Sequence, residues 1–123
     1  GGQLLAWGHA VRVGIADPRD RHHARLHLRL ENASLSTTSC SERGRHLLDP
    51  VRGVTCPAWG SVSVIHSSAL VADLLSTALY VMGPHEGLAW SQVHDVAAVF
   101  LTLDGKCFAS PAFAKHSPLF TER

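Results

Sequence analysis

Asp73 and Thr77 are the residues of this sequence best placed to do chemistry, because they lie four residues apart within its most apolar run, residues 69–82. If that run is a helix, the two side chains lie on one face, one turn apart. The polar residues of this face would be Asp73, Ser76, Thr77 and Tyr80, and Asp73 alone is charged between Ser67 and Gly83. A solvent-exposed helix face usually carries several charged side chains. The pattern therefore indicates either half of a site for a hard cation or a polar stripe without a ligand.

A carboxylate and a hydroxyl are oxygen ligands, which favour magnesium or calcium over zinc or copper. Magnesium suits so small a set, because proteins commonly hold it with one or two groups while water and substrate phosphates complete the coordination. Zinc is the weaker alternative. The one histidine cluster, His22, His23 and His27, has no cysteine near it in sequence to complete a tetrahedral site.

His46 is a candidate general acid or base, because it lies shortly before the turn signal Asp49-Pro50. The commoner alternative is an ordinary histidine at the end of a strand. Arg52, in the same turn, could face an anion, although most arginines in turns are simply solvated.

The composition is that of one small globular domain: 123 residues, 46% hydrophobic and 17% charged. A net charge of +1 neither favours nor excludes a partner and gives only weak support for nucleic acid as the main ligand, so we expect none. The three cysteines form no Cys-x-x-Cys pair, and no apolar segment is long enough to span a bilayer. Because the chain opens on Gly1-Gly2 without a methionine, we expect a fragment that lacks its N-terminal part.

Alternating apolar and polar residues predict several short strands, and turn signals separate them. Residues 19–23 form a basic segment that we expect to be a loop. Ser67 or Ser68 can cap a helix that ends at Gly83, and Pro84 can begin a second helix to residue 93. Since strands and helices do not alternate regularly, the expected class is α+β with a largely antiparallel sheet. The expected strands are 3–7, 11–16, 25–30, 35–39, 61–65, 96–103 and 106–109.

Four stretches together resemble the C-terminal half of the FAD:protein FMN transferase family, the ApbE proteins. Residues 46–53, His-Leu-Leu-Asp-Pro-Val-Arg-Gly, resemble the family's His-Ile-Ile-Asp-Pro-Arg-Thr-Gly. Residues 72–79, Ala-Asp-Leu-Leu-Ser-Thr-Ala-Leu, resemble its Ala-Asp-Ala-Leu-Ser-Thr-Ala-Leu. The other two are the opening Gly-Gly segment, which leads to Val13-Gly14-Ile15, and the closing hairpin, residues 104–111. They follow the family's order and spacing over nearly the whole chain.

The resemblance implies a T-fold-like half domain over residues 1–113, with both helices on one side of the sheet, followed by a tail, residues 114–123. It implies a magnesium-dependent enzyme that cleaves FAD and attaches FMN through a phosphoester to Thr or Ser of an acceptor flavoprotein, such as a subunit of a redox pump. One alternative is an FAD diphosphatase that releases FMN and AMP. The other is a non-catalytic binding module in which Asp73 is structural.

The same resemblance implies roles for individual residues. Asp73 and Thr77 match metal ligands, His46 matches a catalytic residue and Leu47 matches a contact to the flavin nucleotide. A third metal contact would come from backbone upstream of this sequence. The resemblance also suggests a cell-envelope protein, membrane-associated through an N-terminal anchor if one exists, with a cytoplasmic form as the alternative. Gln3 departs from the family pattern, which usually has an acidic residue there.

Overall fold

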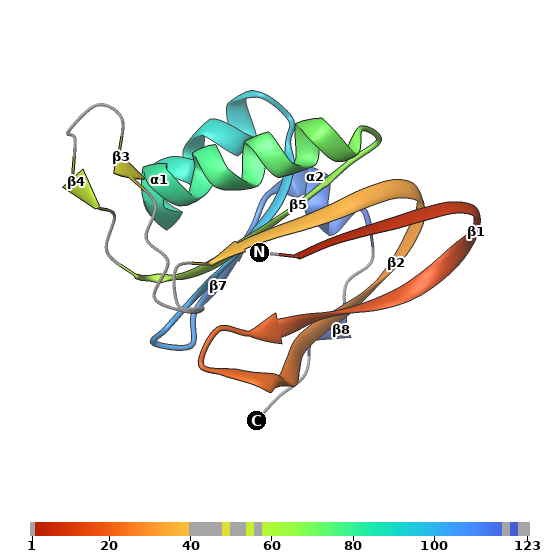
Figure 1. Ribbon diagram of the computed structural model, residues 1–123, viewed down its shortest axis with the longest axis horizontal. Coiled ribbons are helices and arrows are strands. Elements are labelled where there is room, and N and C mark those ends of the chain that lie inside the picture. The colour runs from red at the N-terminus through yellow and green to blue at the C-terminus, as the bar shows by residue number, and fades with distance from the viewer. Residues whose placement is uncertain (1, 40–47, 50–53, 56–57, 117–118, 121–123) are drawn as a thin grey trace.

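The structure is a computed structural model in which one antiparallel sheet carries most of the chain (Figure 1). It describes residues 2–39, 48–49, 54–55, 58–116 and 119–120. The elements in chain order are β1 (Gly2–Asp17), β2 (Asp20–Ser39), β3 (Leu48–Asp49), β4 (Val54–Thr55), β5 (Gly60–His66), α1 (Ala69–Val93), β6 (Ala97–Thr102), β7 (Cys107–Ala109), α2 (Pro111–Ala114) and β8 (Leu119–Phe120).

The strand order of the main sheet is β1-β2-β5-β6-β7, and β8 pairs with β2 near the far end of the long hairpin. β3 and β4 form a separate small antiparallel pair. Every pairing among the described strands is antiparallel, which confirms the predicted α+β class. β8 lies within the stretch that the sequence set apart as a tail.

The β1–β2 hairpin is longer and tighter than the sequence suggested. The expectation of a loop over residues 19–23 was wrong, because β2 already begins at Asp20. The buried carboxylate of Asp17 accepts hydrogen bonds from the backbone N–H of Arg19 at 2.8 Å and from its guanidinium at 3.0 and 3.1 Å. These hydrogen bonds hold the turn at residues 18–19, so the chain reverses within two residues and residues 20–23 join β2.

The predicted alternation in the middle of β2 is confirmed. Leu26, Leu28 and Leu30 are buried, whereas Arg29 is exposed between them. The two strands expected over 25–30 and 35–39 are one continuous strand, and so are those expected over 3–7 and 11–16. The register of the hairpin shifts between Ala6 and Ala10. This irregularity lies where the sequence predicted a break between the strands 3–7 and 11–16.

α1 consists of two helical halves joined at a break, as the sequence predicted. Ser68 caps the start, because its side chain accepts a hydrogen bond from the backbone N–H of Val71 at 3.2 Å. Gly83 has φ 87° and ψ 168°, a conformation that glycine adopts at low cost, and Pro84 starts the next half. Both halves lie on the same side of the sheet (Figure 1). Among the described residues, no helix combines the length and apolarity that a bilayer crossing requires.

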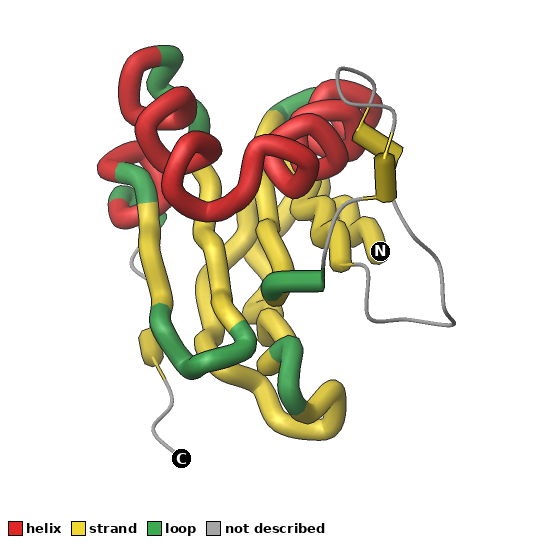
Figure 2. Tube along the Cα trace, turned by 90° about the vertical axis from the view of Figure 1, so that its left-hand side faces the viewer, coloured by secondary structure: helices red, strands yellow, loops and turns green. Residues whose placement is uncertain are grey.

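The sheet is covered on both faces, since its central strands bury side chains alternately to each side. On one face α1 packs through Ala72, Leu79 and Tyr80 against β5 and β6. On the other face the curled hairpin and Phe113 of α2 form a second cluster with the remaining residues of β5 and β6. Figure 2 shows the helices gathered at one end, with the long hairpin extending away from them. Because β5 and β6 are packed on both faces, they hold α1 in a fixed position on the sheet.

Gly87 tests the contact between the second half of α1 and the sheet. A Cβ atom there would lie 2.7 Å from a ring carbon of Phe100 and 3.2 Å from the carbonyl oxygen of Leu79. We expect Gly87→Ala to lower the free energy of unfolding in urea by about 1–3 kcal/mol, the usual cost of overpacking. In an open helix the same change would stabilise by about 1 kcal/mol. The exposed neighbour supplies a control, Glu86→Ala, with an expected change within about 0.5 kcal/mol. A Gly87→Ala variant more stable than wild type would contradict this packing.

Candidate functional site

Asp73 and Thr77 lie in the first half of α1, on the side of the helix that is open to solvent. Asp73 is exposed and Thr77 is half-buried. The Thr77 hydroxyl donates its hydrogen to the backbone carbonyl of Asp73, with an Oγ1–O distance of 3.1 Å. A hydroxyl has one hydrogen and two lone pairs, so this bond leaves the oxygen of Thr77 as an acceptor for a further group. The two side chains thus offer two outward oxygen ligands from one helical turn.

The polar stripe predicted for this helix does not form one face. Ser76 and Tyr80 are both fully buried and point to the sheet, together with Ala72 and Leu79. The Tyr80 hydroxyl accepts a hydrogen bond from the backbone N–H of Trp59 at 3.3 Å. The expectation of one shared face was wrong because the sheet meets the helix along Ala72, Ser76 and Tyr80, so that Asp73 and Thr77 remain at its flank.

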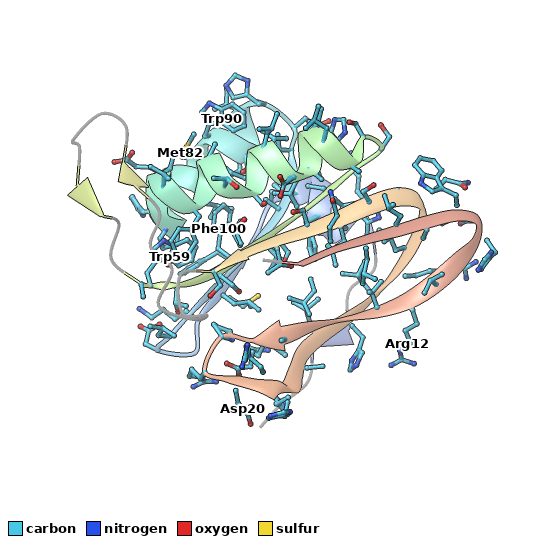
Figure 3. The ribbon with its side chains drawn as sticks, viewed as in Figure 1. Arg12, Asp20, Trp59, Met82, Trp90 and Phe100 are labelled. Carbon is cyan, nitrogen blue, oxygen red and sulfur yellow. The ribbon has the colours of Figure 1, made fainter. Side chains whose placement is uncertain are left out.

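Three aromatic rings, those of Trp59, Tyr80 and Phe100, pack between the first half of α1 and the sheet. The rings of Trp59 and Tyr80 stack at a centroid distance of 4.8 Å, and the indole N–H of Trp59 donates to the Tyr80 carbonyl at 3.1 Å. Phe100 follows at 6.2 Å from Trp59, and both labelled rings lie beneath α1 in Figure 3. This stack fixes the helix on β5 and β6 one to two turns beyond the Asp73–Thr77 pair.

A cluster of hydroxyl groups joins the same helical turn to β2. The hydroxyl of Ser76 donates to the Asp73 carbonyl at 3.0 Å and lies 2.7 Å from the Thr38 hydroxyl and 3.2 Å from that of Ser36. Ser36 in turn donates to the carboxylate of Asp73 at 3.5 Å. Sequence reasoning missed Ser36 and Thr38. The available signal was their spacing, since residues two apart on a strand lie on the same face.

The predicted residues His46 and Leu47 lie outside the residues that the structure describes, as does Arg52. The two short described strands of this region pair with each other, Leu48 with Thr55 and Asp49 with Val54. The roles of His46 and Leu47 therefore stay predictions.

The donor set in the described part of the chain contains no group of three or more His, Cys, Asp or Glu residues able to hold a metal ion. Cys107 packs partly buried against the hydrophobic core, and this burial raises the pKa of its thiol. What remains is one carboxylate and one hydroxyl, oriented outward. This set fits magnesium, which accepts few protein ligands and keeps water or phosphate oxygens in its other positions. It does not fit zinc, which needs three or four nitrogen, sulfur or carboxylate ligands.

Ser76 tests whether the hydroxyl cluster stabilises the fold. We expect Ser76→Ala to lower the free energy of unfolding by about 1–3 kcal/mol, because the buried Thr38 hydroxyl would lose its 2.7 Å partner. Urea denaturation at equilibrium measures the change. Ser67→Ala, at an exposed serine just before the helix, is the control and should change stability by less than about 0.5 kcal/mol. Equal stability of Ser76→Ala and wild type would show that the cluster contributes nothing to folding.

Comparison with solved structures supports the fold and the family. The chain is 32% identical to the flavinyl transferase ApbE of Pseudomonas stutzeri in its apo form, with a TM-score of 0.78 over 94% of this chain and 42% of that one. It is 26% identical to the flavin transferase ApbE of Vibrio cholerae, with a TM-score of 0.73 over 86% of this chain and 37% of that one. The chain therefore spans about two fifths of the length of these relatives. The search of curated proteins found no match.

A further structure, the ApbE protein of Thermotoga maritima, is 24% identical with a TM-score of 0.76 over 87% of this chain and 38% of that one, and so supports the fold alone. The sequence matches the model of the ApbE family over residues 1–100. This stretch includes the whole of α1, with the Asp73–Thr77 turn, and the whole of β2 and β5. The resemblance noted from the sequence is confirmed, and the chain belongs to the ApbE family.

Proposed function

We propose that this chain supplies part of the active site of a magnesium-dependent flavin transferase. The enzyme cleaves FAD and attaches FMN through a phosphoester to a Thr or Ser side chain of an acceptor flavoprotein. The observation that carries the proposal is the outward pair of oxygens on Asp73 and Thr77, set in a fold shared with proteins named flavin transferases. FAD is the substrate, and a subunit of a redox pump is the kind of acceptor expected.

The two side chains contribute differently to the binding of a magnesium ion. Asp73 provides a negative charge, and its exposure keeps the carboxylate within reach of a bound ion. Thr77 provides a neutral oxygen whose direction is set by its hydrogen bond to the Asp73 carbonyl. When bound, the ion neutralises charge on the diphosphate and orients the attacking and leaving oxygens. Two protein ligands imply that water, phosphate and groups outside this sequence complete the coordination.

His46 and Leu47 complete the proposal through the family resemblance. His46 takes the proton from the acceptor hydroxyl as that oxygen attacks phosphorus, which is the task of a general base. Leu47, the next residue, contacts the flavin nucleotide. The location that the resemblance suggests, the cell envelope with association to the membrane, belongs to the proposal as well.

An FAD diphosphatase on the same scaffold is the alternative reaction, since water can replace the acceptor hydroxyl as the attacking group. The products separate the two reactions. The full-length protein is incubated with FAD, magnesium and an acceptor flavoprotein, and the mixture is analysed by mass spectrometry. A transferase adds FMN to the acceptor, whereas a diphosphatase releases FMN and AMP and leaves the acceptor unmodified.

Asp73 tests the metal assignment directly. In the full-length protein we expect Asp73→Ala to lower turnover of FAD by at least about 100-fold, the scale on which active sites lose rate when one electrostatic group is removed. AMP release over a range of magnesium concentrations is the measurement. The matched control is Glu86→Ala, which removes an exposed carboxylate from the second half of the same helix and should leave turnover unchanged. Persistence of magnesium-dependent turnover in Asp73→Ala would contradict the assignment and favour the non-catalytic module.

Because this chain matches only part of the length of its relatives, we expect it to bind FAD weakly on its own. Since the chain spans 42% of the Pseudomonas stutzeri transferase, we expect the isolated 123 residues to bind FAD at least about tenfold more weakly than that protein, a loss of ~1.4 kcal/mol. Isothermal titration with FAD and magnesium measures both proteins side by side. Equal affinities would contradict this expectation and mean that these 123 residues form the whole FAD pocket.

A further inference from the structure

We propose that Ser36 is a positioning residue for Asp73: its hydroxyl orients the carboxylate for metal binding. This inference rests on the proposed function, in which Asp73 is a magnesium ligand. Ser36 is on β2, 37 residues before Asp73, and it takes no part in the sequence motifs that identify the family. The structure alone brings the two side chains together.

The carboxylate of Asp73 needs such a partner because it is exposed and can rotate about its two side-chain bonds. Within the described part of the chain, Ser36 is the side chain that bonds this carboxylate, with an Oγ–Oδ1 distance of 3.5 Å. Magnesium demands nearly ideal octahedral geometry at short distances. A ligand already held in one orientation loses less conformational freedom on binding the ion, and therefore binds it more tightly.

Within the cluster of Ser36, Thr38 and Ser76, the hydroxyl hydrogen of Ser36 is available to bond the carboxylate of Asp73. Ser76 donates its hydrogen to the Asp73 carbonyl at 3.0 Å. Thr38 can then donate to Ser76, at 2.7 Å, because the Ser76 oxygen keeps two lone pairs. Ser36 has two acceptors in reach, the neutral Ser76 oxygen at 3.2 Å and the carboxylate. An ionised carboxylate can only accept, so Ser36 is the donor in its contact with Asp73.

The position of Ser36 is fixed from several sides. Its side chain is buried, with 1% of its surface exposed. Its strand is paired on both edges at this residue, with Gln3 of β1 and Val64 of β5. The amide of Gln3 also donates to the carbonyl of Ala69 at the start of α1, which ties the edge strand to the helix. Ser36 therefore holds the carboxylate of Asp73 in a fixed place relative to the sheet, whereas the helix alone would leave this side chain free to rotate.

The test is a direct measurement of metal binding by the full-length protein, with Mn²⁺ as the probe and electron paramagnetic resonance as the readout. We expect Ser36→Ala to weaken Mn²⁺ binding about tenfold, the lower end of the range for groups that orient metal ligands. Ser36→Thr keeps the hydroxyl on a strand, where β-branched residues are well accommodated, and should retain most of the affinity. Urea denaturation of each variant shows separately whether the fold is affected.

Ser34 provides a matched control, because it lies two residues away on the same face of the same strand and is also fully buried. Its hydroxyl has no hydrogen-bond partner among the described residues, so Ser34→Ala should leave Mn²⁺ affinity unchanged at little cost in stability. A loss of affinity common to both alanine variants would reflect general packing and overturn the proposal. So would wild-type affinity in Ser36→Ala, or a Ser36→Thr variant as weak as Ser36→Ala.

Asp73→Ala separates this inference from the proposed function. If wild type binds Mn²⁺ and Asp73→Ala does not, Asp73 is a ligand, and the Ser36 variants then decide the positioning role alone. If Asp73→Ala binds as tightly as wild type, or wild type binds no Mn²⁺, the metal site itself is wrong and the positioning role fails with it.

Discussion

The contact between the first half of α1 and the face of β2, β5 and β6 is the interaction on which the rest of the structure depends. Along β5 and β6 it is apolar, where Leu79 and Tyr80 pack on the sheet and Trp59 stacks beneath them. Along β2 it is polar, where Ser76 meets the hydroxyls of the strand. The buried hydroxyls of Ser36, Thr38 and Ser76 are tolerated there because Ser76 is hydrogen-bonded to both of the others. The polar edge of this contact is where Asp73 and Thr77 emerge.

This arrangement explains how two modest side chains can form part of a metal site. An exposed carboxylate on a helix is usually a solvated group, but that of Asp73 accepts a hydrogen bond from Ser36 of the neighbouring strand. The pair remains too small to enclose a cation, and magnesium that is shared with a diphosphate needs no enclosed site. Under the proposed function, binding of the ion and binding of FAD would depend on each other, as expected for an enzyme that acts on a phosphoryl group.

Membership of the ApbE family follows from the sequence match and the fold, whereas the reaction depends on the chemistry of the site. The chain matches about two fifths of the length of two proteins named flavin transferases. Within that share, the structure describes Asp73, Thr77 and the hydroxyl cluster beside them. His46 and Leu47, the other half of the proposed site, rest on the motif of residues 46–53.

The sequence by itself determined the local features. An i, i+4 spacing places Asp73 and Thr77 together on any helix, Gly83-Pro84 breaks a helix wherever it occurs, and alternation buries Leu26, Leu28 and Leu30. Only the tertiary structure decided which flank of α1 meets the sheet. The flank of α1 that meets the sheet depends on contacts between residues far apart in the chain. These contacts bury Ser76, leave Asp73 exposed and bring Ser36 to the carboxylate of Asp73. Local periodicity carries no information about such a partner, because the partner's position is set by strand pairing and not by its neighbours in sequence.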